Sequence, residues 1–214
     1  MNFKLEKIFD RYGKIYAYEI LLSDSSQIDW VTIDCHWLNS NVYSQLNYLL
    51  RKGYLLENNA LFCTSTPKNN IKFFVNIERR QLKSISFLNI LSGCIDKLRE
   101  NKVSIFLEIT ERDSDFEVDI NYLNKLKRKF GFLFVADDVV EGDARKEEIE
   151  NGLYDVVKVE SSYITNGSSR LREEILAIKQ NFDCKFLAEK IETNSMHKEA
   201  LSLPIDYFQG YLYP

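Results

Sequence analysis

Two adjacent carboxylates, Asp137 and Asp138, follow an apolar run that begins at Phe132, directly after Gly131. An apolar run of this length predicts a buried strand. Two charges at the end of a buried strand cost free energy unless a partner neutralises them. A bound divalent cation is one such partner, and an exposed loop start is the ordinary alternative. The other polar residues of the chain must therefore decide between a metal site and a surface turn.

Polar side chains also stand at or near the ends of six other predicted strands. One such residue alone is usually a cap or a surface group. The carboxyl ends of parallel barrel strands, however, converge on one mouth, where active sites lie. The repetition therefore favours one shared site over scattered surface polarity. The six residues are Glu19, Asn76, Glu108, Lys158, Glu189 and Gln209.

The types of these residues indicate their chemistry. Carboxylates and one amide oxygen, without His or Cys, suit Mg²⁺ or Mn²⁺, and several carboxylates in one mouth can hold two ions. Two ions can stabilise the attacking and leaving oxygens of an in-line phosphoryl displacement. Lys158 can neutralise the carboxylates, orient the attacking water, or do both. The 4 Cys and 2 His are scattered, so no zinc site is expected.

The elements between these residues must bring them together. Residues 3–9 and 14–22 predict a β-hairpin around a turn at 10–13, and apolar spacing from 33 to 50 predicts a helix that ends near Gly53. Strands then alternate with helices, which is typical of a parallel sheet with crossover helices. Further strands are expected at 71–77, 103–109, 132–138, 154–159, 185–189 and 207–212, and helices around 82–98, 120–130, 147–153, 168–182 and 196–203.

The eight strands predict an α/β fold and suit a closed barrel. An open doubly wound sheet is the alternative. It is disfavoured because the chain has neither G-x-G-x-x-G after the first strand nor G-x-x-x-x-G-K. With 214 residues, the chain is expected to form a single domain over residues 1–214.

Composition and charge limit the partners and the compartment. The net charge of −4 argues against a nucleic-acid polymer, although not against a nucleotide held by metal ions. The first residues lack the apolar segment of a signal peptide. No run of about 18 apolar residues predicts a membrane span. A cytoplasmic protein without membrane contact is therefore expected.

Several stretches resemble EAL domains, in order and in approximate spacing. EAL domains are bacterial phosphodiesterases that open cyclic di-GMP to linear pGpG. The resemblance covers nearly the whole chain, and the eponymous Glu-Ala-Leu is here Glu19-Ile20-Leu21. The matching stretches are Tyr18-Glu19-Ile20-Leu21-Leu22, Asn76, Glu108-Ile109-Thr110-Glu111, Asp137-Asp138, Lys158-Val159-Glu160, Ala188-Glu189-Lys190-Ile191-Glu192 and Gln209-Gly210-Tyr211.

The resemblance implies a role for each matched residue. Lys158 would contact the attacking water, Glu189 would support the second metal, and Gln209 would help to position the water or metal shell. Glu111 would steady the loop after the Asp pair. The resemblance implies an α/β fold, a modified TIM-type (β/α)8 barrel whose first strand runs antiparallel to the rest, which agrees with the predicted hairpin. The implied metal ligands are Glu19, Asn76, Glu108 and Asp137, with Asp138 bridging to the second ion.

The chain also departs from the family pattern. The substrate-phosphate contact is implied around Leu22 and Ser23, where the family usually has Arg at position 23. The family usually has Phe-Gly-x-Gly after the Asp pair, whereas this chain has Val-Val-Glu-Gly-Asp over 139–143. Losing a Gly pair changes which backbone angles the loop can adopt. The Gly of the family's Ala-Glu-Gly is here Lys190.

Three hypotheses follow. The first is an active, metal-dependent phosphodiesterase for cyclic di-GMP. The second is a non-catalytic EAL-like regulator that binds cyclic di-GMP or a protein partner, which Ser23 and the altered loop favour. The third is a barrel enzyme for another phosphodiester, because loops would determine base recognition. EAL domains often dimerise through the region after the Asp pair, so a homodimer is a further expectation.

Overall fold

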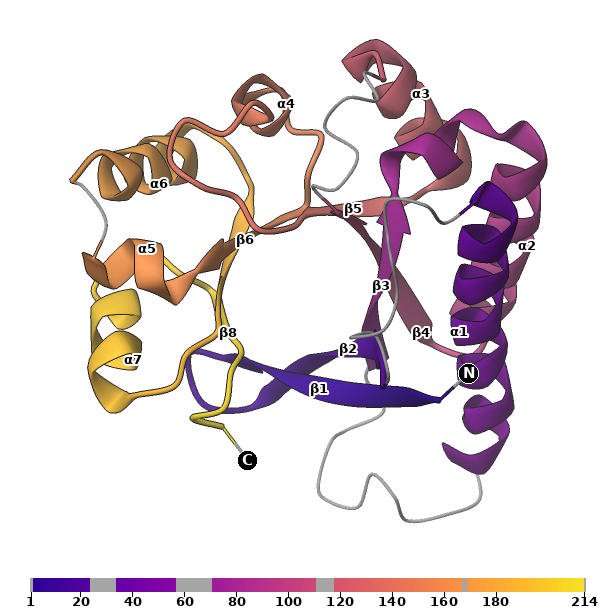
Figure 1. Ribbon diagram of the computed structural model, residues 1–214, viewed down its shortest axis with the longest axis horizontal. Helices are drawn as coiled ribbons and strands as arrows, with labels where there is room; N and C mark the ends of the chain where they lie inside the picture. Colours follow the sequence, from indigo (N-terminus) through magenta and orange to yellow (C-terminus); the bar gives the residue numbers. More distant parts are fainter. Residues whose placement is uncertain (1, 24–33, 57–70, 111–117, 167–168, 214) are drawn as a thin grey trace.

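A computed structural model of the protein describes residues 2–23, 34–56, 71–110, 118–166 and 169–213. Within these ranges, eight strands close into a barrel in the order of the sequence (Figure 1). β1 pairs antiparallel with both β2 and β8, and all other neighbouring strands pair parallel. The predicted modified (β/α)8 barrel with an antiparallel first strand is therefore confirmed. The strands are β1 (Phe3–Asp10), β2 (Ile15–Leu22), β3 (Ile71–Glu78), β4 (Val103–Thr110), β5 (Leu133–Ala136), β6 (Val156–Glu160), β7 (Lys185–Glu189) and β8 (Tyr207–Phe208).

Helices pack around the outside of the barrel and connect its parallel strands (Figure 1). Their ends follow local sequence signals. The Ser84 side chain accepts a hydrogen bond from Phe87 N at the start of α2, and Gly131, with φ 63°, ends α3 in the left-handed region. The helices are α1 (Cys35–Leu56), α2 (Ile85–Glu100), α3 (Ile120–Phe130), α4 (Lys146–Glu150), α5 (Ser161–Asn166), α6 (Ser169–Asn181) and α7 (Asn194–Leu201), with a 3-10 turn, η2, at Arg79–Lys83.

The hairpin of β1 and β2 closes the barrel on its antiparallel side. Its turn forms because the Asp10 carboxylate accepts hydrogen bonds from Tyr12 N and Lys14 N, both at 2.9 Å, while Gly13 takes a φ of 73°. The strand register places Glu6 of β1 opposite Glu19 of β2. The hairpin therefore carries two carboxylates side by side.

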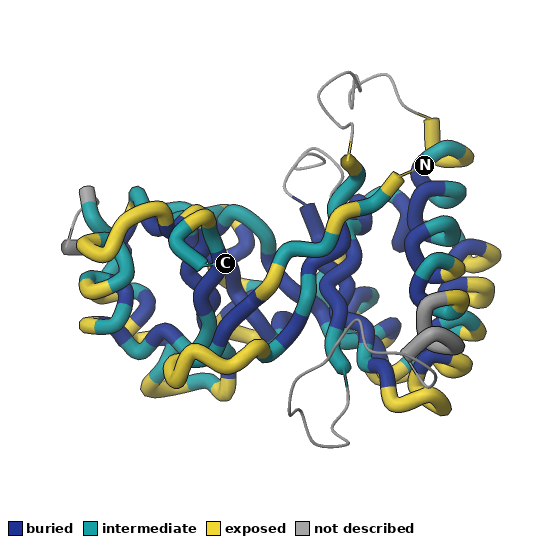
Figure 2. The backbone as a smooth tube through the Cα atoms, turned by 90° about the horizontal axis from the view of Figure 1, so that it is seen from below, coloured by how far each residue is buried: buried dark blue, intermediate teal, exposed yellow. Residues whose placement is uncertain are grey.

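An apolar layer fills the inside of the barrel. Successive side chains of a strand point to opposite faces, so every second residue faces the barrel axis. The inward residues form a cluster distinct from the larger one between the strands and the helices. Figure 2 shows buried residues along the inner strands and exposed ones on the outer turns. The inner cluster contains Ile8, Ala17, Phe74, Phe106, Val135, Val156 and Leu187, with Tyr16, Leu133 and Tyr207 packed against it.

The elements differ from the sequence predictions at several points, and three of these differences have a clear physical reason. Helix α1 continues to Leu56, past Gly53, because one interior Gly weakens a helix without necessarily ending it. Helix α5 was not predicted, since its six residues are too few to show a clear period. Strand β8 ends at Phe208 and not near residue 212, because Gly210, with a φ of 145°, turns the chain against Ile191.

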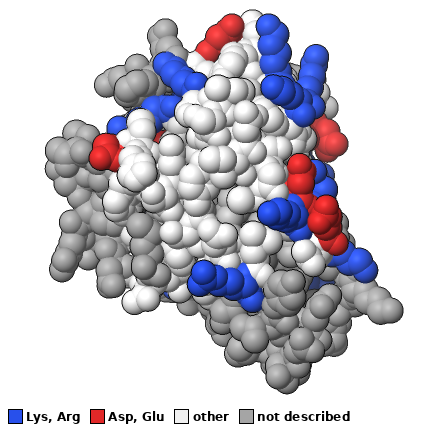
Figure 3. Space-filling model, turned by 90° about the vertical axis from the view of Figure 1, so that its right-hand side faces the viewer, with Lys and Arg blue, Asp and Glu red and all other residues white. Residues whose placement is uncertain are grey.

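The outer surface has one weakly charged side. On the side where α1 and α2 lie, charged side chains surround a broad uncharged area (Figure 3). α1 has no Asp, Glu, Lys or Arg from residue 35 to residue 50. Among the described residues, none of the helices combines the length and the apolar character that crossing a membrane requires.

Candidate active site

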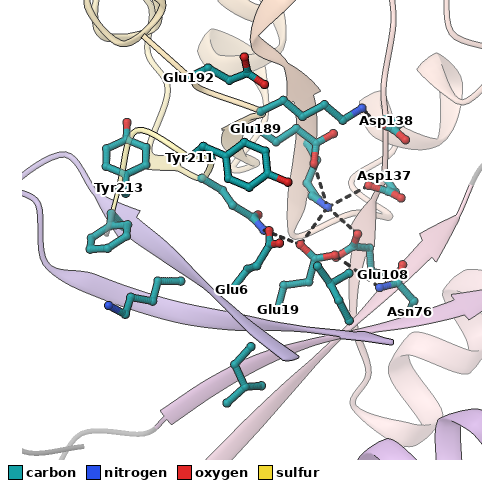
Figure 4. Close-up of a pocket in the computed structure, with 18 residues that line it drawn as sticks. Glu6, Glu19, Asn76, Glu108, Asp137, Asp138, Glu189, Glu192, Tyr211 and Tyr213 are labelled. Carbon is teal, nitrogen blue, oxygen red and sulfur yellow. Dashed lines mark hydrogen bonds and ion pairs between the residues drawn. The ribbon is translucent and has the colours of Figure 1, made fainter. Parts of the chain in front are cut away.

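Polar side chains from several barrel strands point towards one another and line one cavity (Figure 4). On each parallel strand, the residue two positions after the inward apolar residue, towards the carboxyl end, is polar. Because side chains alternate between the two faces of a strand, this polar residue also points into the barrel. On antiparallel β1 the matching residue is Glu6, two positions before Ile8. All of these polar residues line one cavity of about 580 Å³. The pairs on the parallel strands are Ala17 and Glu19, Phe74 and Asn76, Phe106 and Glu108, Val135 and Asp137, Val156 and Lys158, Leu187 and Glu189, and Tyr207 and Gln209.

The structure therefore brings together the predicted residues at the carboxyl ends of the strands. The deeper group surrounds the Lys158 ammonium, and we call it the floor. The shallower group contains Asp138, Glu160 and Lys190, and we call it the rim. The floor consists of Glu19, Asn76, Glu108, Asp137, Lys158 and Glu189.

The Lys158 ammonium lies at the centre of the floor, among its carboxylates. Its Nζ lies 2.5 Å from Glu108 Oε1, 3.0 Å from Asp137 Oδ1 and 3.0 Å from Glu189 Oε2. A fourth carboxylate oxygen, Glu19 Oε2, lies 3.6 Å away. The Lys158 side chain is only 3% exposed. One buried ammonium thus faces four carboxylates from four different strands, which leaves an excess of negative charge at the floor.

Glu19 is held from the other side by amide groups. The Gln209 Nε2 donates to Glu19 Oε2 at 2.7 Å and to Glu6 Oε2 at 3.2 Å. The Asn76 Nδ2 donates to Glu19 Oε1 at 3.5 Å. Gln209 therefore joins the two carboxylates of the hairpin and fixes the orientation of Glu19.

The backbone of the Asp pair is anchored between two strands. Asp137 N donates to Ile109 O at 3.4 Å, and Val139 N donates to Lys158 O at 2.9 Å. Strand alternation alone would turn Asp138 away from the cavity, but its φ of 47° returns the side chain to it. Asp tolerates the left-handed region better than most residues. One carboxylate oxygen each from Asp137, Asp138 and Glu189 lies within 4.8 Å of the others.

The rim is joined by a second lysine. The Lys190 Nζ lies 2.7 Å from Glu160 Oε2 and 3.3 Å from Asp138 Oδ1. Lys190 also has a positive φ, 54°. Its carbonyl accepts a hydrogen bond from Ser161 Oγ at 2.9 Å. The side chain therefore starts from a fixed backbone and reaches across β6 to the Asp pair.

Burial and crowding change the proton affinity of the floor. Burial, followed by the nearby Glu19 carboxylate, raises the pKa of Glu108 well above its ordinary value. Burial also raises the pKa of Glu189, to about 8, although the Lys158 ammonium opposes this. Burial disfavours the Lys158 ammonium itself, but the surrounding carboxylates, Asp137 foremost, outweigh burial and raise its pKa well above the ordinary value. The surrounding carboxylates thus favour the ammonium form of Lys158, which is a hydrogen-bond donor.

The residues of the floor suit a hard divalent cation. Carboxylate and amide oxygens from several strands face one another, and a divalent ion would relieve their mutual repulsion. Three buried oxygens, Glu108 Oε2, Glu189 Oε1 and Gln209 Oε1, accept no hydrogen bond from the part of the chain that the structure describes. Buried oxygens without a donor are costly, and a metal ion or its water shell would satisfy them. The donor set therefore fits the predicted cation.

Gly210 joins the floor to the rim through the backbone. Ile191 N donates to Gln209 O at 3.0 Å, and Leu212 N donates to Ile191 O at 2.9 Å. A Cβ at Gly210 would lie 2.3 Å from both Ile191 N and Ile191 O. Only Gly permits this approach. The Gln209-Gly210 pair thus sets the distance between β7 and the segment after β8.

The barrel and its polar layer have counterparts among known proteins. A family model described as the EAL domain matches residues 43–214. The chain belongs to the EAL domain family. The family resemblance expected from the sequence motifs is therefore confirmed.

Relatives in this EAL family match most of the chain at modest identity. The cyclic di-GMP phosphodiesterase PdeA of Borreliella burgdorferi is 28% identical over 183 residues, which cover 81% of this chain and 27% of PdeA. The uncharacterized protein YuxH of Bacillus subtilis is 25% identical over 217 residues, which cover 97% of this chain and 45% of YuxH. The chain thus spans about a quarter of PdeA and less than half of YuxH.

Solved EAL structures share the fold. The manganese and cyclic di-GMP complex of Klebsiella pneumoniae BlrP1 superimposes with a TM-score of 0.74 at 16% identity, covering 98% of this chain and 54% of that one. Bacillus subtilis YkuI, in complex with cyclic di-GMP and calcium, gives a TM-score of 0.69 at 21% identity, with coverage of 98% and 53%. At these identities the likeness establishes the barrel architecture.

Two of the residues expected in this EAL site, Leu22 and Ser23, do not line the cavity in the structure, and a third falls outside the described residues. Leu22 points away from it because strand alternation gives the inward position to Leu21, which lines the cavity. Ser23 is exposed in the turn after β2, and its backbone N donates to Asn2 O. Glu111 lies outside the described residues.

Sequence reasoning missed several residues that line the cavity. Glu6 could have been found, because antiparallel pairing across the short turn at 10–13 places it opposite Glu19. Lys190 and Tyr211 were noticed only as parts of motifs. Their place in the cavity depends on the φ of Lys190 and on the turn at Gly210, and neither has a signal in periodicity.

Proposed function

We propose that the protein hydrolyses cyclic di-GMP to linear pGpG with the help of Mg²⁺ or Mn²⁺. The observation that carries the proposal is the polar layer, in which parallel strands of the barrel deliver carboxylates and amides around Lys158. Its cavity of about 580 Å³ lies within the range of about 300–1,000 Å³ that is usual for small-molecule sites. The membership in the EAL family and the likeness to PdeA support the choice of substrate.

The floor carboxylates would hold the cations. Glu19, Asn76, Glu108 and Asp137 would bind one ion, and Asp138 with Glu189 would contribute to a second. Bound divalent ions polarise phosphoryl oxygens and favour the deprotonation of a bound water.

The chain's own residues would orient the reactants. Lys158 would donate a hydrogen bond to the attacking water and so orient it. Gln209 would keep Glu19 in its binding orientation through the bond between Nε2 and Oε2. Water adds to phosphorus while the bond from phosphorus to the 3′ oxygen breaks, and the proton of the water ends on the released 3′ hydroxyl after exchange with solvent.

A turnover assay tests the proposal. The purified chain is incubated with cyclic di-GMP and Mn²⁺ or Mg²⁺, and pGpG is measured by chromatography. We expect pGpG with either ion, none in chelator, and a loss of at least about 100-fold in Glu19→Ala, whose carboxylate is central to the floor. Glu147→Ala, which removes an exposed carboxylate on α4, should retain activity. No turnover over a long incubation would contradict the proposal.

A second candidate function is a regulator that binds cyclic di-GMP without hydrolysing it. Two observations favour it. Ser23, at the position of the family's phosphate-binding Arg, is exposed and outside the cavity lining. The loop after the Asp pair is fixed by Asp143, whose carboxylate accepts hydrogen bonds from Arg145 Nε at 2.9 Å and Arg145 Nη2 at 2.7 Å. Calorimetry with Ca²⁺ and cyclic di-GMP, followed by the turnover assay, separates binding from hydrolysis.

The closed barrel supports the proposal that residues 1–214 fold as one domain. Homodimer formation and a cytoplasmic location remain predictions from the sequence. Size-exclusion chromatography with light scattering tests the dimer.

A further inference from the structure

Lys190 occupies an unusual position at the rim. Because Glu189 points into the cavity, strand alternation would direct Lys190 outward. Its φ of 54° instead brings the side chain over the cavity edge, where Nζ meets Glu160 Oε2 at 2.7 Å and Asp138 Oδ1 at 3.3 Å. The Ser161 hydroxyl and the Ile191 amide fix the backbone on both sides. The backbone on both sides of Lys190 is therefore held by hydrogen bonds, and this fixes the place from which the side chain extends.

Asp138 faces Lys190 from the neighbouring side of the cavity, and it also has a positive φ, 47°. Asp138 and Lys190 are two of the three described residues other than Gly that adopt the left-handed region, and their side chains meet. For Lys this conformation costs free energy that Gly would avoid. The two ion pairs that the Lys190 ammonium makes, with Glu160 and Asp138, offset part of this cost.

The contact bears on metal binding because Asp138 belongs to the group formed with Asp137 and Glu189. A divalent ion that bound Asp138 would have to displace the Lys190 ammonium or share the carboxylate with it. Positive charges a few ångströms apart repel even in a partly solvated site. The deeper floor residues Glu19, Asn76 and Glu108 make no contact with Lys190 among the described interactions.

We propose that Lys190 is a built-in cation that competes for Asp138, so that the site binds one divalent ion tightly and a second ion only weakly. Lys190 is thus a positioning residue that sets metal stoichiometry. This inference rests on the proposed metal-dependent function, and it adds the number of ions and the residue that limits it.

Counting bound Mn²⁺ tests the inference. Electron paramagnetic resonance of free Mn²⁺, titrated against the whole chain, gives the dissociation constant of each ion without any need for turnover. We expect one tight ion in the wild type. In Lys190→Met, which keeps the chain length and loses the charge, the second dissociation constant should fall about tenfold, which corresponds to about 1.4 kcal/mol.

Matched variants separate this effect from fold and from total charge. Lys190→Arg keeps the charge and should bind like the wild type. Lys146→Met removes another half-exposed lysine, which lies near Glu150 and Glu174 and outside the cavity lining, and it should leave both dissociation constants unchanged. If Lys190→Met folds poorly, Lys190→Gly removes the same charge and also relieves the positive φ.

The outcomes distinguish the two proposals. Equal second-ion affinity in the wild type and in Lys190→Met, with pGpG formation retained, overturns the inference alone. An equal shift in Lys146→Met also overturns it, because the cause would then be net charge. The absence of Mn²⁺ binding in every variant overturns the proposed function and the inference together.

Discussion

The two lysines of the cavity show how burial decides what the same side chain does. Lys158 at the floor is 3% exposed and lies near four carboxylates, whereas Lys190 at the rim is 54% exposed and lies near two. Water screens the rim pair, and its contribution to stability is small. At the floor, the side chains are largely buried, so water cannot replace the ammonium as a partner of the carboxylates. Lys158 is therefore expected to be needed for the stability of the site, whereas Lys190 is expected to change its metal binding with little effect on stability.

Removing the floor lysine should have the largest effect. Lys158→Met leaves four carboxylates without a cation, so the free energy of unfolding in chelator should fall by about 3–5 kcal/mol. The same substitution at the rim, Lys190→Met, should cost less than about 1 kcal/mol. Urea denaturation at pH 8 measures both values. Similar losses in the two variants would contradict the distinction between floor and rim.

Breaking the link between floor and rim should have the next largest effect. Gly210→Ala places a Cβ 2.3 Å from the backbone of Ile191, so the unfolding free energy should fall by about 2–3 kcal/mol. Gly93→Ala in α2 is the control, because its Cβ would meet nothing within 4 Å and its helix propensity improves by up to about 1 kcal/mol. Thermal melting compares the stability of the two variants with that of the wild type. An unchanged melting temperature in Gly210→Ala would show that stability does not depend on the close approach of residue 210 to Ile191.

Metal binding at the floor should depend on pH. Burial raises the pKa of Glu189 to about 8, so the folded, metal-free protein holds a proton there at neutral pH, and the second ion, to which Asp138 and Glu189 would contribute, must displace that proton. Affinity for Mn²⁺ should therefore rise by up to about tenfold per pH unit below 8 and level off above it. The proton linkage also predicts that the metal-free protein loses stability as the pH rises from the ordinary pKa of 4.5 to about 8. Calorimetric titrations at pH 6.5, 7.5 and 8.5 check the slope, and a flat profile would contradict it.

The smallest effect is expected from relief of the rim backbone. Lys190→Gly removes a positive φ that costs Lys about 1 kcal/mol and also removes two exposed ion pairs worth up to about 1 kcal/mol. The two contributions oppose each other, so the unfolding free energy should change by less than about 1 kcal/mol in chelator. Comparison with Lys190→Met, which keeps the strain, isolates the backbone contribution. A large loss in Lys190→Gly would place the ammonium among the structurally essential groups.

The floor could be predicted from the sequence because it follows the period of the strands. Glu108 stands two residues after Phe106, and Lys158 stands two residues after Val156, so one alternation explains both layers. The parallel connections then bring the strand ends together. Each strand alone showed only a polar residue near its end, and the signal came from the repetition.

The rim could not be predicted in the same way because its geometry breaks the period. Asp138 and Lys190 enter the cavity through positive φ angles. Leu22 does not line the cavity for a related reason, since the alternation places Leu21 inward. The short β8 ends at a backbone approach between Gly210 and Ile191, which are separated by 19 positions in the sequence. Such features depend on tertiary contacts that no local pattern encodes.

The location of Mn²⁺ in crystals tests the central claim most directly. Anomalous scattering should show an ion at the floor, bounded by Glu19, Asn76, Glu108 and Asp137, with the Lys158 ammonium moved away from at least one of its carboxylates. A floor without an anomalous peak, in which Lys158 still contacts all four carboxylates at saturating Mn²⁺, would contradict the account.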